Sequence, residues 1–357
     1  MHEIEVYAKR RGMAIASTAS LSVYVSEWEN GRRPVSDLYA AILRAVLGMT
    51  NRELFGESVK SDDDAADGYD ALLQRIESAH SVSGTLVETM LRQTELLRTV
   101  DRQMGAPGIV DQMQAHLNTL SEAMTFAVLP STRQPIARAL AGAATLAAWQ
   151  ALDVGAADRA WRHYELAKRA ARDAEDPLYV AHSMGEQAYV LLDAGKPELA
   201  AELVREARAS NASQLSPRLL AWLYAAEAEM HAHAGRADDC RRSLDMAVAV
   251  LPAGTEARDP DMLSIFLNEN HLARWRGNAL ALIGQDDAVS QLRAALESMD
   301  PTFLRAQSGV RCDLAQAHAF RGEYDEAAAQ LREARRLANR TGSIRHRQRI
   351  ERITQQI

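Results

Sequence analysis

The chain has 357 residues, of which 47% are apolar but only 5% aromatic, and its formal net charge is −7. Alanine dominates the apolar share, which is typical of thin, close-packed helical cores, and the length suffices for two or more domains. The longest apolar stretch, 136–154, is interrupted by charged and polar residues and is built from alanine, which makes it a poor membrane span. Two cysteines, Cys240 and Cys312, and no secretory leader pattern fit a reducing cytoplasm. We therefore expect a cytoplasmic, all-α protein without membrane contact.

Residues 1–56 carry the pattern of a small helical module. Leu21, Val25 and Trp28 are spaced at i, i+4 and i+7, which places them on one face of a helix over about 20–30. Asn30-Gly31 ends this helix, and Arg-Arg-Pro at 32–34 forms the turn that follows. A preceding helix is predicted over 3–11. The helix after the turn is predicted to bury Leu38, Ile42, Val46 and Leu47.

A resemblance adds to this reading. The run Val-Ser-Glu-Trp-Glu-Asn-Gly-Arg-Arg-Pro at 25–34, then Leu-Gly-Met-Thr at 47–50 and Glu-Leu-Phe-Gly at 53–56, resembles the second half of a phage-repressor-type (Cro-like) helix-turn-helix. We expect a truncated module of this kind. The resemblance implies a recognition helix in the major groove of double-stranded DNA and turn arginines on phosphates. It assigns DNA contacts to Ser22, Val23, Ser26, Glu27, Asn30, Arg32 and Arg33.

The charge of this module favours only weak non-specific attraction to DNA. Its seven Lys or Arg and six Asp or Glu leave a net charge of +1. Two interpretations stay open: a functional DNA-binding module, and a vestigial motif that does not bind DNA.

Residues 57–130 connect this module to the rest of the chain. The polar, acidic segment 57–66 predicts a linker that leads into a helix, and three amphipathic stretches follow at 69–81, 85–104 and 108–129. Two roles are open for these stretches: dimerisation, and packing against the C-terminal part. A palindromic operator requires two recognition helices, so we expect a homodimer if the module binds DNA.

Five glycines mark a repeat in the next segment, at spacings of 40, 40, 49 and 38 residues. They are Gly155, Gly195, Gly235, Gly284 and Gly322. Seven residues before each lies another tiny residue, which is needed where two helices approach closely, and glycine supplies the φ > 0 of a turn. This fixed spacing predicts stacked helical hairpins, with an insertion over 251–260 that explains the longest gap.

The repeats resemble a known architecture. Gly-Glu-Tyr-Asp-Glu-Ala at 322–327, with Leu331 and Ala334, resembles the tetratricopeptide repeat, and the unit at Gly155 is similar, with Ala160, Tyr164 and Ala167. The resemblance covers about 136–340. It implies an α-solenoid of about five hairpins over 131–342, preceded by the helix-turn-helix module and a helical linker bundle.

The same resemblance implies a binding groove. Positions thirteen, ten and six before each turn glycine face the concave side in such repeats. The residues it places there are Trp149, His182, Tyr189, Trp222, Glu229, His271, Arg274, Asn278, Cys312 and Gln316. This aromatic and polar lining suits a peptide, a small molecule or a protein partner. The alternative is that the tryptophans are buried between hairpins and the histidines are merely exposed.

The C-terminal stretch is basic. Residues 335–352 contain seven Arg against the single acidic Glu351. We expect residues 343–357 to form a basic helix that caps the solenoid, and the alternative is a second phosphate-binding patch.

Catalytic and metal-site patterns are not supported. His231 and His233, with Cys240 nearby, are two residues apart on a helix and point to different sides, so they do not form a metal site. No phosphate loop, nucleophile elbow or dinucleotide fingerprint is present in the sequence. We expect no enzyme activity, no cofactor and no metal.

Taken whole, the chain resembles actinobacterial helix-turn-helix regulators with a C-terminal tetratricopeptide-like sensor. Segments that match this group are 73–77, 185–192 and 271–277. The resemblance implies transcriptional control by a sensed ligand. The second hypothesis is an adaptor that binds a partner in its groove and retains a vestigial helix-turn-helix.

Overall fold

The structure is a computed structural model that describes residues 2–10, 13, 15–47, 49, 54, 62–210, 212–254, 258–259, 262 and 264–357, with the backbone alone for 10, 37 and 62–68. Within these residues the regular elements are helices, with one isolated bridge between Arg258 and Phe266 and no strand. The all-α prediction is confirmed. None of the described helices is both long and apolar enough to cross a membrane. The chain divides into two compact units, Met1–Gln74 and Arg75–Ile357.

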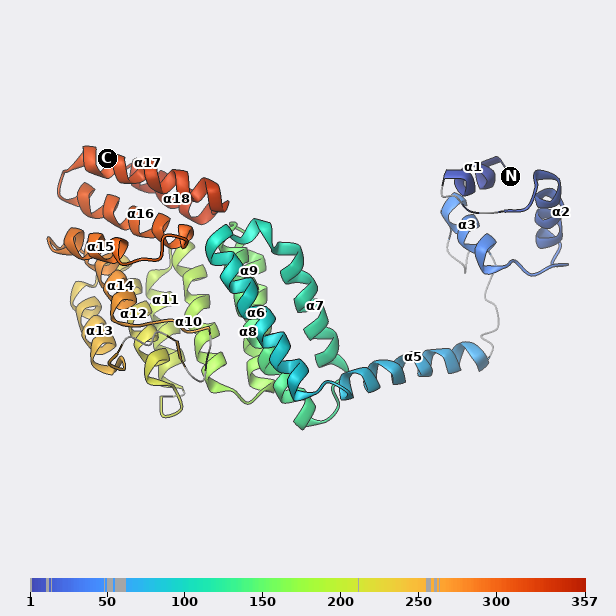
Figure 1. Ribbon diagram of the computed structural model, residues 1–357, viewed down its shortest axis with the longest axis horizontal. Coiled ribbons are helices and arrows are strands. Elements are labelled where there is room, and N and C mark those ends of the chain that lie inside the picture. Colours follow the sequence, from blue (N-terminus) through green and yellow to red (C-terminus); the bar gives the residue numbers. More distant parts are fainter. Residues whose placement is uncertain are drawn as a thin grey trace. The chain divides into compact units, whose positions relative to one another are not determined.

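The described part of the first unit contains three helices (Figure 1) packed around a small apolar core. Helix α1 spans His2–Arg10, α2 spans Thr18–Glu29 and α3 spans Asp37–Leu47. Ile4, Leu21 and Ile42 are buried at the centre, as the spacing predicted for Leu21. The Ser17 hydroxyl accepts the Ser20 N–H at the start of α2, which satisfies one free donor of that helix end.

Helix α3 is rotated relative to the predicted stripe. Leu38 and Leu47 are 41% and 51% exposed, so their predicted burial is wrong. The Tyr39 hydroxyl accepts a hydrogen bond from the Ala16 N–H (2.8 Å), which holds Tyr39 toward the core. Residues three, four and seven positions after Tyr39 share its helix face. The side chains that face the core are therefore Tyr39, Ile42, Leu43 and Val46.

Helix α5 spans Asp62–His80 and begins earlier than the sequence suggested. Residues 62–66 of the predicted linker are helical, and residues 57–61 lie outside the described part of the chain. Three consecutive aspartates open the helix, where negative charge is favoured by the helix dipole.

Two amphipathic helices lead into the repeats. Helix α6 spans Gly84–Met104, a 3₁₀ turn spans Ala106–Gly108, and α7 spans Val110–Phe126. Their apolar faces belong to the same buried core as the first repeat helix. For the second and third of the three predicted stretches, packing against the C-terminal part is observed.

The repeats form five hairpins within the described residues from 130 to 341. The paired helices are α8 (Pro130–Asp153) with α9 (Ala157–Asp173), α10 (Pro177–Asp193) with α11 (Pro197–Ala209), α12 (Pro217–His233) with α13 (Ala237–Val250), α14 (Glu269–Leu282) with α15 (Ala288–Glu297), and α16 (Leu304–Phe320) with α17 (Tyr324–Thr341). All five predicted turn glycines have φ between 68° and 76°, which confirms their role. The predicted insertion lies in the connection between α13 and α14.

The solenoid closes on itself, which the sequence did not predict. Helix α18 spans Ile344–Thr354 and packs against α16, α17 and α8, while α16 and α17 also contact α6 (Figure 1). Gly105 lies so close to the Thr341 carbonyl that a side chain there would collide with it. At the same seam the Ser343 hydroxyl donates to the Asp153 carboxylate (2.6 Å). The two ends of the repeat array are therefore joined by direct contacts.

Candidate functional site

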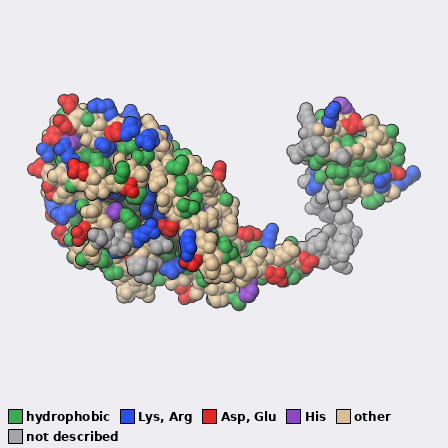
Figure 2. All heavy atoms as spheres, in the orientation of Figure 1, with side chains coloured by type: hydrophobic (Ala, Val, Ile, Leu, Met, Phe, Trp, Pro, Cys, Tyr) green, Lys and Arg blue, Asp and Glu red, His purple; other side chains and the backbone are tan. Residues whose placement is uncertain are grey.

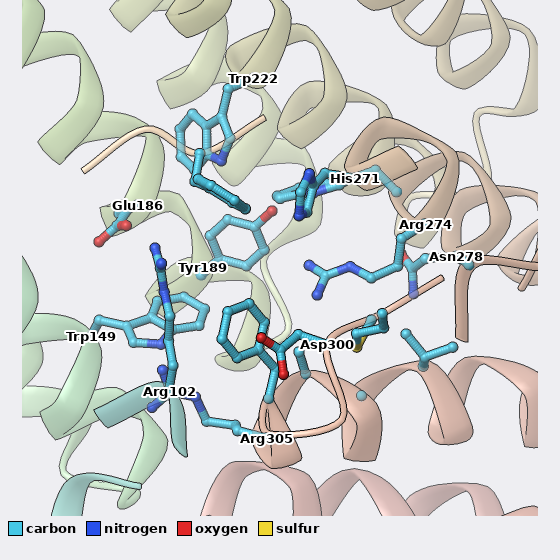
Figure 3. A pocket seen from close by; sticks show the side chains of 18 of the residues that line it. Arg102, Trp149, Glu186, Tyr189, Trp222, His271, Arg274, Asn278, Asp300 and Arg305 are labelled. Atoms are coloured by element: carbon cyan, nitrogen blue, oxygen red, sulfur yellow. The ribbon is translucent and has the colours of Figure 1, made fainter. Parts of the chain in front are cut away.

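A cavity of about 580 Å³ lies on the concave side of the solenoid, within the second unit. It is lined by the first helix of each hairpin, α8, α10, α12, α14 and α16, and also by α6, residues 264–268 and α18 (Figure 3). This volume falls in the range of small-molecule sites, about 300–1,000 Å³. Closure of the solenoid forms the cavity, because α6 and α18 supply walls that an open array of hairpins would lack.

The structure brings most of the predicted groove residues into this one cavity. Those that line it are Trp149, His182, Tyr189, Trp222, Glu229, His271, Arg274 and Asn278. Gln316 and Cys312 are not brought there. Cys312 is buried against Ile350 and Ile353 of α18, so α18 covers the part of α16 that would otherwise face the groove. The positions counted back from the turn glycine therefore place their predicted residues in the cavity for the first four hairpins, whereas in the last hairpin neither Cys312 nor Gln316 reaches it.

One wall of the cavity is a continuous series of aromatic rings. The Trp149 and Tyr189 ring centroids are 5.9 Å apart, those of Tyr189 and Trp275 are 6.3 Å apart, and those of Trp275 and Trp222 are 6.1 Å apart, all edge to face. The His182 ring follows, 5.3 Å from Trp222. Such edge-to-face contacts stabilise a fixed arrangement of rings. Trp275 was not predicted, because it lies nine residues before Gly284, outside the three positions of the register.

Tyr189 and Glu229 form a buried hydrogen-bonded pair in this wall. The tyrosine hydroxyl donates to Glu229 Oε2 over 2.9 Å. Burial raises the pKa of Glu229 above its usual value, and it raises the pKa of Tyr189 well above 10. Tyr189 therefore keeps its proton at neutral pH and remains a donor to Glu229, so this carboxylate already has a partner.

Arginine–carboxylate pairs join α16 to α6 and α8, where the two ends of the repeat array meet beside the cavity. Arg305 of α16 lies against Asp101 of α6 and Asp153 of α8. Burial alone would lower the pKa of Arg305, but the two carboxylates outweigh burial, so the pKa is raised. All three side chains are nearly inaccessible to solvent. Removing one member of such a buried group leaves an uncompensated charge, so these contacts hold the seam together.

Helix α18 covers the cavity on the side where α10 ends. Arg345 binds both oxygens of Asp193, the last residue of α10, at 2.6 and 3.1 Å, and Arg349 pairs with Asp313 of α16 at 2.5 Å. Helix C-termini carry partial negative charge, which favours a basic helix across them. The predicted C-terminal cap is thus a helix packed across the concave side. Two of its arginines, Arg345 and Arg349, pair with carboxylates of other helices.

For two arginines that line the cavity, no acidic partner is found in the described part of the chain. Among the described residues, no carboxylate lies within ion-pair distance of Arg102 on α6 or Arg274 on α14, although Arg274 lies 5.9 Å from the Trp275 ring centroid. Burial, and then the nearby Arg98, lowers the pKa of Arg102 to about 10. Burial, followed by the charges of Arg274 and Arg102, lowers the pKa of His271 to about 4. His271 is therefore neutral at pH 7 and lies in a positive field.

Most of the predicted DNA-contact residues of the first unit are exposed. Ser22, Val23 and Ser26 on α2 are exposed, and Asn30 follows the helix with its side-chain amide bonded to the Ser26 carbonyl (2.7 Å). Arg32 is exposed, and no partner is found for it within the described residues.

Glu27 and Arg33 engage each other within the module. Their charged groups are 3.5 Å apart, and the Arg33 guanidinium lies 3.8 Å from the centroid of the Tyr24 ring. One of the two turn arginines is thus partly neutralised, and Arg32 is the freer of the two.

Metal and thiol chemistry gain no support from the geometry. Within the described residues, no group of three or more His, Cys, Asp or Glu could hold a metal ion. Burial raises the pKa of Cys240 to about 11 and that of Cys312 to about 12, so both remain protonated thiols at neutral pH.

Sequence reasoning missed the cavity residues contributed by the elements that meet where the solenoid closes, namely α6, the start of α16 and α18. Arg98, Asp101 and Arg102 come from α6, Phe303 immediately precedes α16, Arg305 lies on α16, and Arg345, His346 and Arg349 come from α18. The basic run at 335–352 was the one available signal. Figure 2 shows basic and acidic side chains interspersed over the visible face of the second unit, so no segregated charge patch marks the cavity there.

Comparisons with known proteins identify no family. No protein-family model matches the chain, and no curated protein matches it. Among solved structures the chain is similar to the nearly identical TPR-like repeats of a kinesin light chain from Podosopora anserina, with 18% identity and a TM-score of 0.35, over 56% of this chain and 94% of that one. It is also similar to aspartyl phosphate phosphatase F from Bacillus subtilis, with 15% identity and a TM-score of 0.46, over 94% of this chain and 88% of that one.

Proposed function

We propose that the protein is a DNA-binding transcriptional regulator whose second unit binds a peptide, small molecule or protein partner in the concave cavity. The observation that carries the sensing half is the cavity itself, with its aromatic wall and two arginines that have no ion-pair partner among the residues the structure describes. In this proposal the cavity binds and does not catalyse. Ligand binding would change DNA affinity only to the extent that the ligand favours one of two states of the protein.

The exposed side of α2 supports the DNA-binding half. Leu21 points into the core, which leaves Ser22, Val23 and Ser26 free to contact base edges, and Arg32 is available for a phosphate. These are the residue types and the placement that the helix-turn-helix resemblance requires. The low net charge of the module makes its binding dependent on base contacts more than on general attraction to DNA.

A homodimer belongs to the same proposal. Two recognition helices are needed for a palindromic site, because each half-site takes one helix. Helix α5 leaves Tyr69, Leu72 and Leu73 exposed, at 69%, 42% and 52%. These apolar side chains are our candidates for contact with a second copy, and the molar mass in solution by light scattering tests this.

The first experiment selects DNA from fragments of the host genome with the purified full chain and quantifies binding of the recovered sites. We expect discrete sites, with Arg32→Ala weakening binding to all of them and reducing its salt dependence. Arg335→Ala is the matched control, because Arg335 is exposed on α17 of the other unit.

The alternative is an adaptor with a vestigial motif, favoured by the Glu27–Arg33 pair that neutralises part of the turn. An absence of selected sites for the intact, folded chain would support that alternative and contradict the regulator. Selected sites that Arg32→Ala and Arg335→Ala affect equally would place DNA binding elsewhere in the chain.

A further inference from the structure

The charged side chains that line the cavity determine whether it favours a negatively or a positively charged ligand. Each carboxylate there has an internal partner: Asp101 has Arg305, Asp313 has Arg349 and Asn278, Glu229 has Tyr189, Glu186 has His182, and Asp300 has Thr302. Four of the six lining arginines are also paired, namely Arg98, Arg305, Arg345 and Arg349. Among the described residues, Arg102 and Arg274 are the two charged side chains of the lining for which no hydrogen-bond or ion-pair partner is found, and both are positive.

These two arginines face the same space. Figure 3 shows Arg274 extending into the cavity from α14 and Arg102 entering from the other side of the view, with Tyr189 between them. Both charges act on His271, which places all three groups in one neighbourhood. The lowered pKa of Arg102 shows that its charge is destabilised by burial there. A bound anion would relieve that cost.

The apolar half of the cavity determines the shape of the rest of the ligand. The series Trp149, Tyr189, Trp275 and Trp222 presents ring edges and faces along one wall, and Phe266 and Phe303 lie near Arg102, with ring centroids 5.5 and 6.0 Å from its guanidinium. A flat, apolar group packs well against such rings. Within the described part of the chain, no hydrogen-bond partner is found for the buried Asn278 Oδ1 and Ser264 Oγ atoms, so each can bond a polar edge of that group.

The size of the space argues against a long ligand. Helix α18 lies across the concave side and is held there by the Arg345 and Arg349 pairs, in the region that a partner helix would need. A cavity of about 580 Å³ suits one small molecule.

From these observations we propose that the cavity binds a small aromatic carboxylate, with Arg102 and Arg274 binding the carboxylate and the tryptophan–tyrosine wall packing on the ring. This rests on the proposed function of the cavity as a sensor site and names its ligand class. It predicts that the negative charge of the ligand is required, because a neutral analogue of the same shape would leave both arginines unpaired.

The test is isothermal titration of the full chain with matched pairs of acid and amide: indole-3-acetate with indole-3-acetamide, and cinnamate with cinnamamide. We expect at least one acid to bind at least tenfold more tightly than its amide. Arg274→Gln should remove this preference. Arg276→Gln is the matched control, since Arg276 is exposed on the same helix, and it should keep the preference.

Three results would overturn the proposal: no acid binds the folded chain, acids and amides bind equally, or the preference survives in both Arg274→Gln and Arg102→Gln. Tighter binding of the peptide Ala-Ala-Ala-Phe than of either acid would also overturn it, in favour of a peptide ligand. The DNA selection above is read separately. Acid binding without selected DNA sites contradicts the regulator alone, and selected sites without acid binding contradict the ligand class alone.

Discussion

The two compact units are both helical, but they differ in what they bury. The first unit buries a few apolar side chains around Leu21 and keeps the polar residues proposed to contact DNA at its surface. The second unit buries charged and polar groups, among them Asp101, Asp153 and His182, beside an alanine-rich core. A surface site needs only a stable scaffold beneath it, whereas an interior site requires its charges to be satisfied within the fold. The following predictions test this difference, beginning with the largest expected effect.

Removing the central charge of the seam should have the largest effect. Arg305→Ala leaves Asp101 and Asp153 buried without a counter-charge, and we expect a loss of about 3–5 kcal/mol in the unfolding free energy of the second unit. Urea unfolding followed by circular dichroism measures this. Arg336→Ala breaks an exposed pair with Glu333 and should leave the midpoint unchanged. Equal midpoints for the two variants would show that the seam does not depend on this ion group.

The small core of the first unit should be nearly as sensitive. Leu21→Ala removes a fully buried side chain and should cost about 2–5 kcal/mol, which is enough to unfold a module of this size. DNA binding should then be lost while ligand binding in the second unit persists. Val23→Ala, at a position that is 53% exposed, should change stability by less than about 0.5 kcal/mol. Loss of both activities in Leu21→Ala would mean that the units do not fold independently.

Substitutions at two glycines with positive φ distinguish the cost of backbone strain from the cost of disturbing the closure of the solenoid. Gly195 (φ 74°) has open space beside it, so Gly195→Ala should cost only about 1–2 kcal/mol for the left-handed conformation. Gly105 (φ 84°) faces the Thr341 carbonyl across the seam, so Gly105→Ala should cost more and should weaken ligand binding. Thermal unfolding and titration measure both effects. A Gly105→Ala protein that binds as the wild type does would show that closure is not needed for the site.

The smallest effect concerns pH. In the unfolded chain His271 binds a proton near pH 6.5, but in the folded chain burial lowers its pKa to about 4. Its contribution to stability is therefore complete above about pH 6.5 and is lost as the pH falls toward 4. Burial lowers the pKa of His116 and His346 as well, so they add to the same trend. Glu229, whose pKa is raised, acts in the opposite sense, since its contribution is lost as the pH rises through its folded pKa.

Thermal midpoints at several pH values between 7.5 and 4.5 measure this dependence. The midpoint of the wild type should fall with acidification, and His271→Gln should fall less steeply. Parallel profiles for the two proteins would show that His271 does not carry a share of the pH dependence.

Much of the repeat architecture could be predicted because it is encoded locally. The turn glycines, such as Gly155, and the tiny residues seven positions before them lie within one hairpin, and a helix face is set by a period of 3.6 residues. The same register placed Trp149, Tyr189 and Arg274 on the inner helices, where the cavity lies. It failed for Gln316, since the position of α18 over α16 depends on contacts outside that hairpin.

The sequence by itself determined the helical hairpins, their turns and the residues of the inner helices, because each depends on neighbours a few positions away. Only the tertiary structure decided that the solenoid closes and that Arg102 and Arg274 line its cavity without an ion-pair partner among the described residues. The Arg305–Asp101 contact joins residues 204 positions apart, and the Ser343–Asp153 contact joins residues 190 apart. Local periodicity contains no information on such pairings, because they depend on the accumulated twist of five hairpins, which no single repeat records.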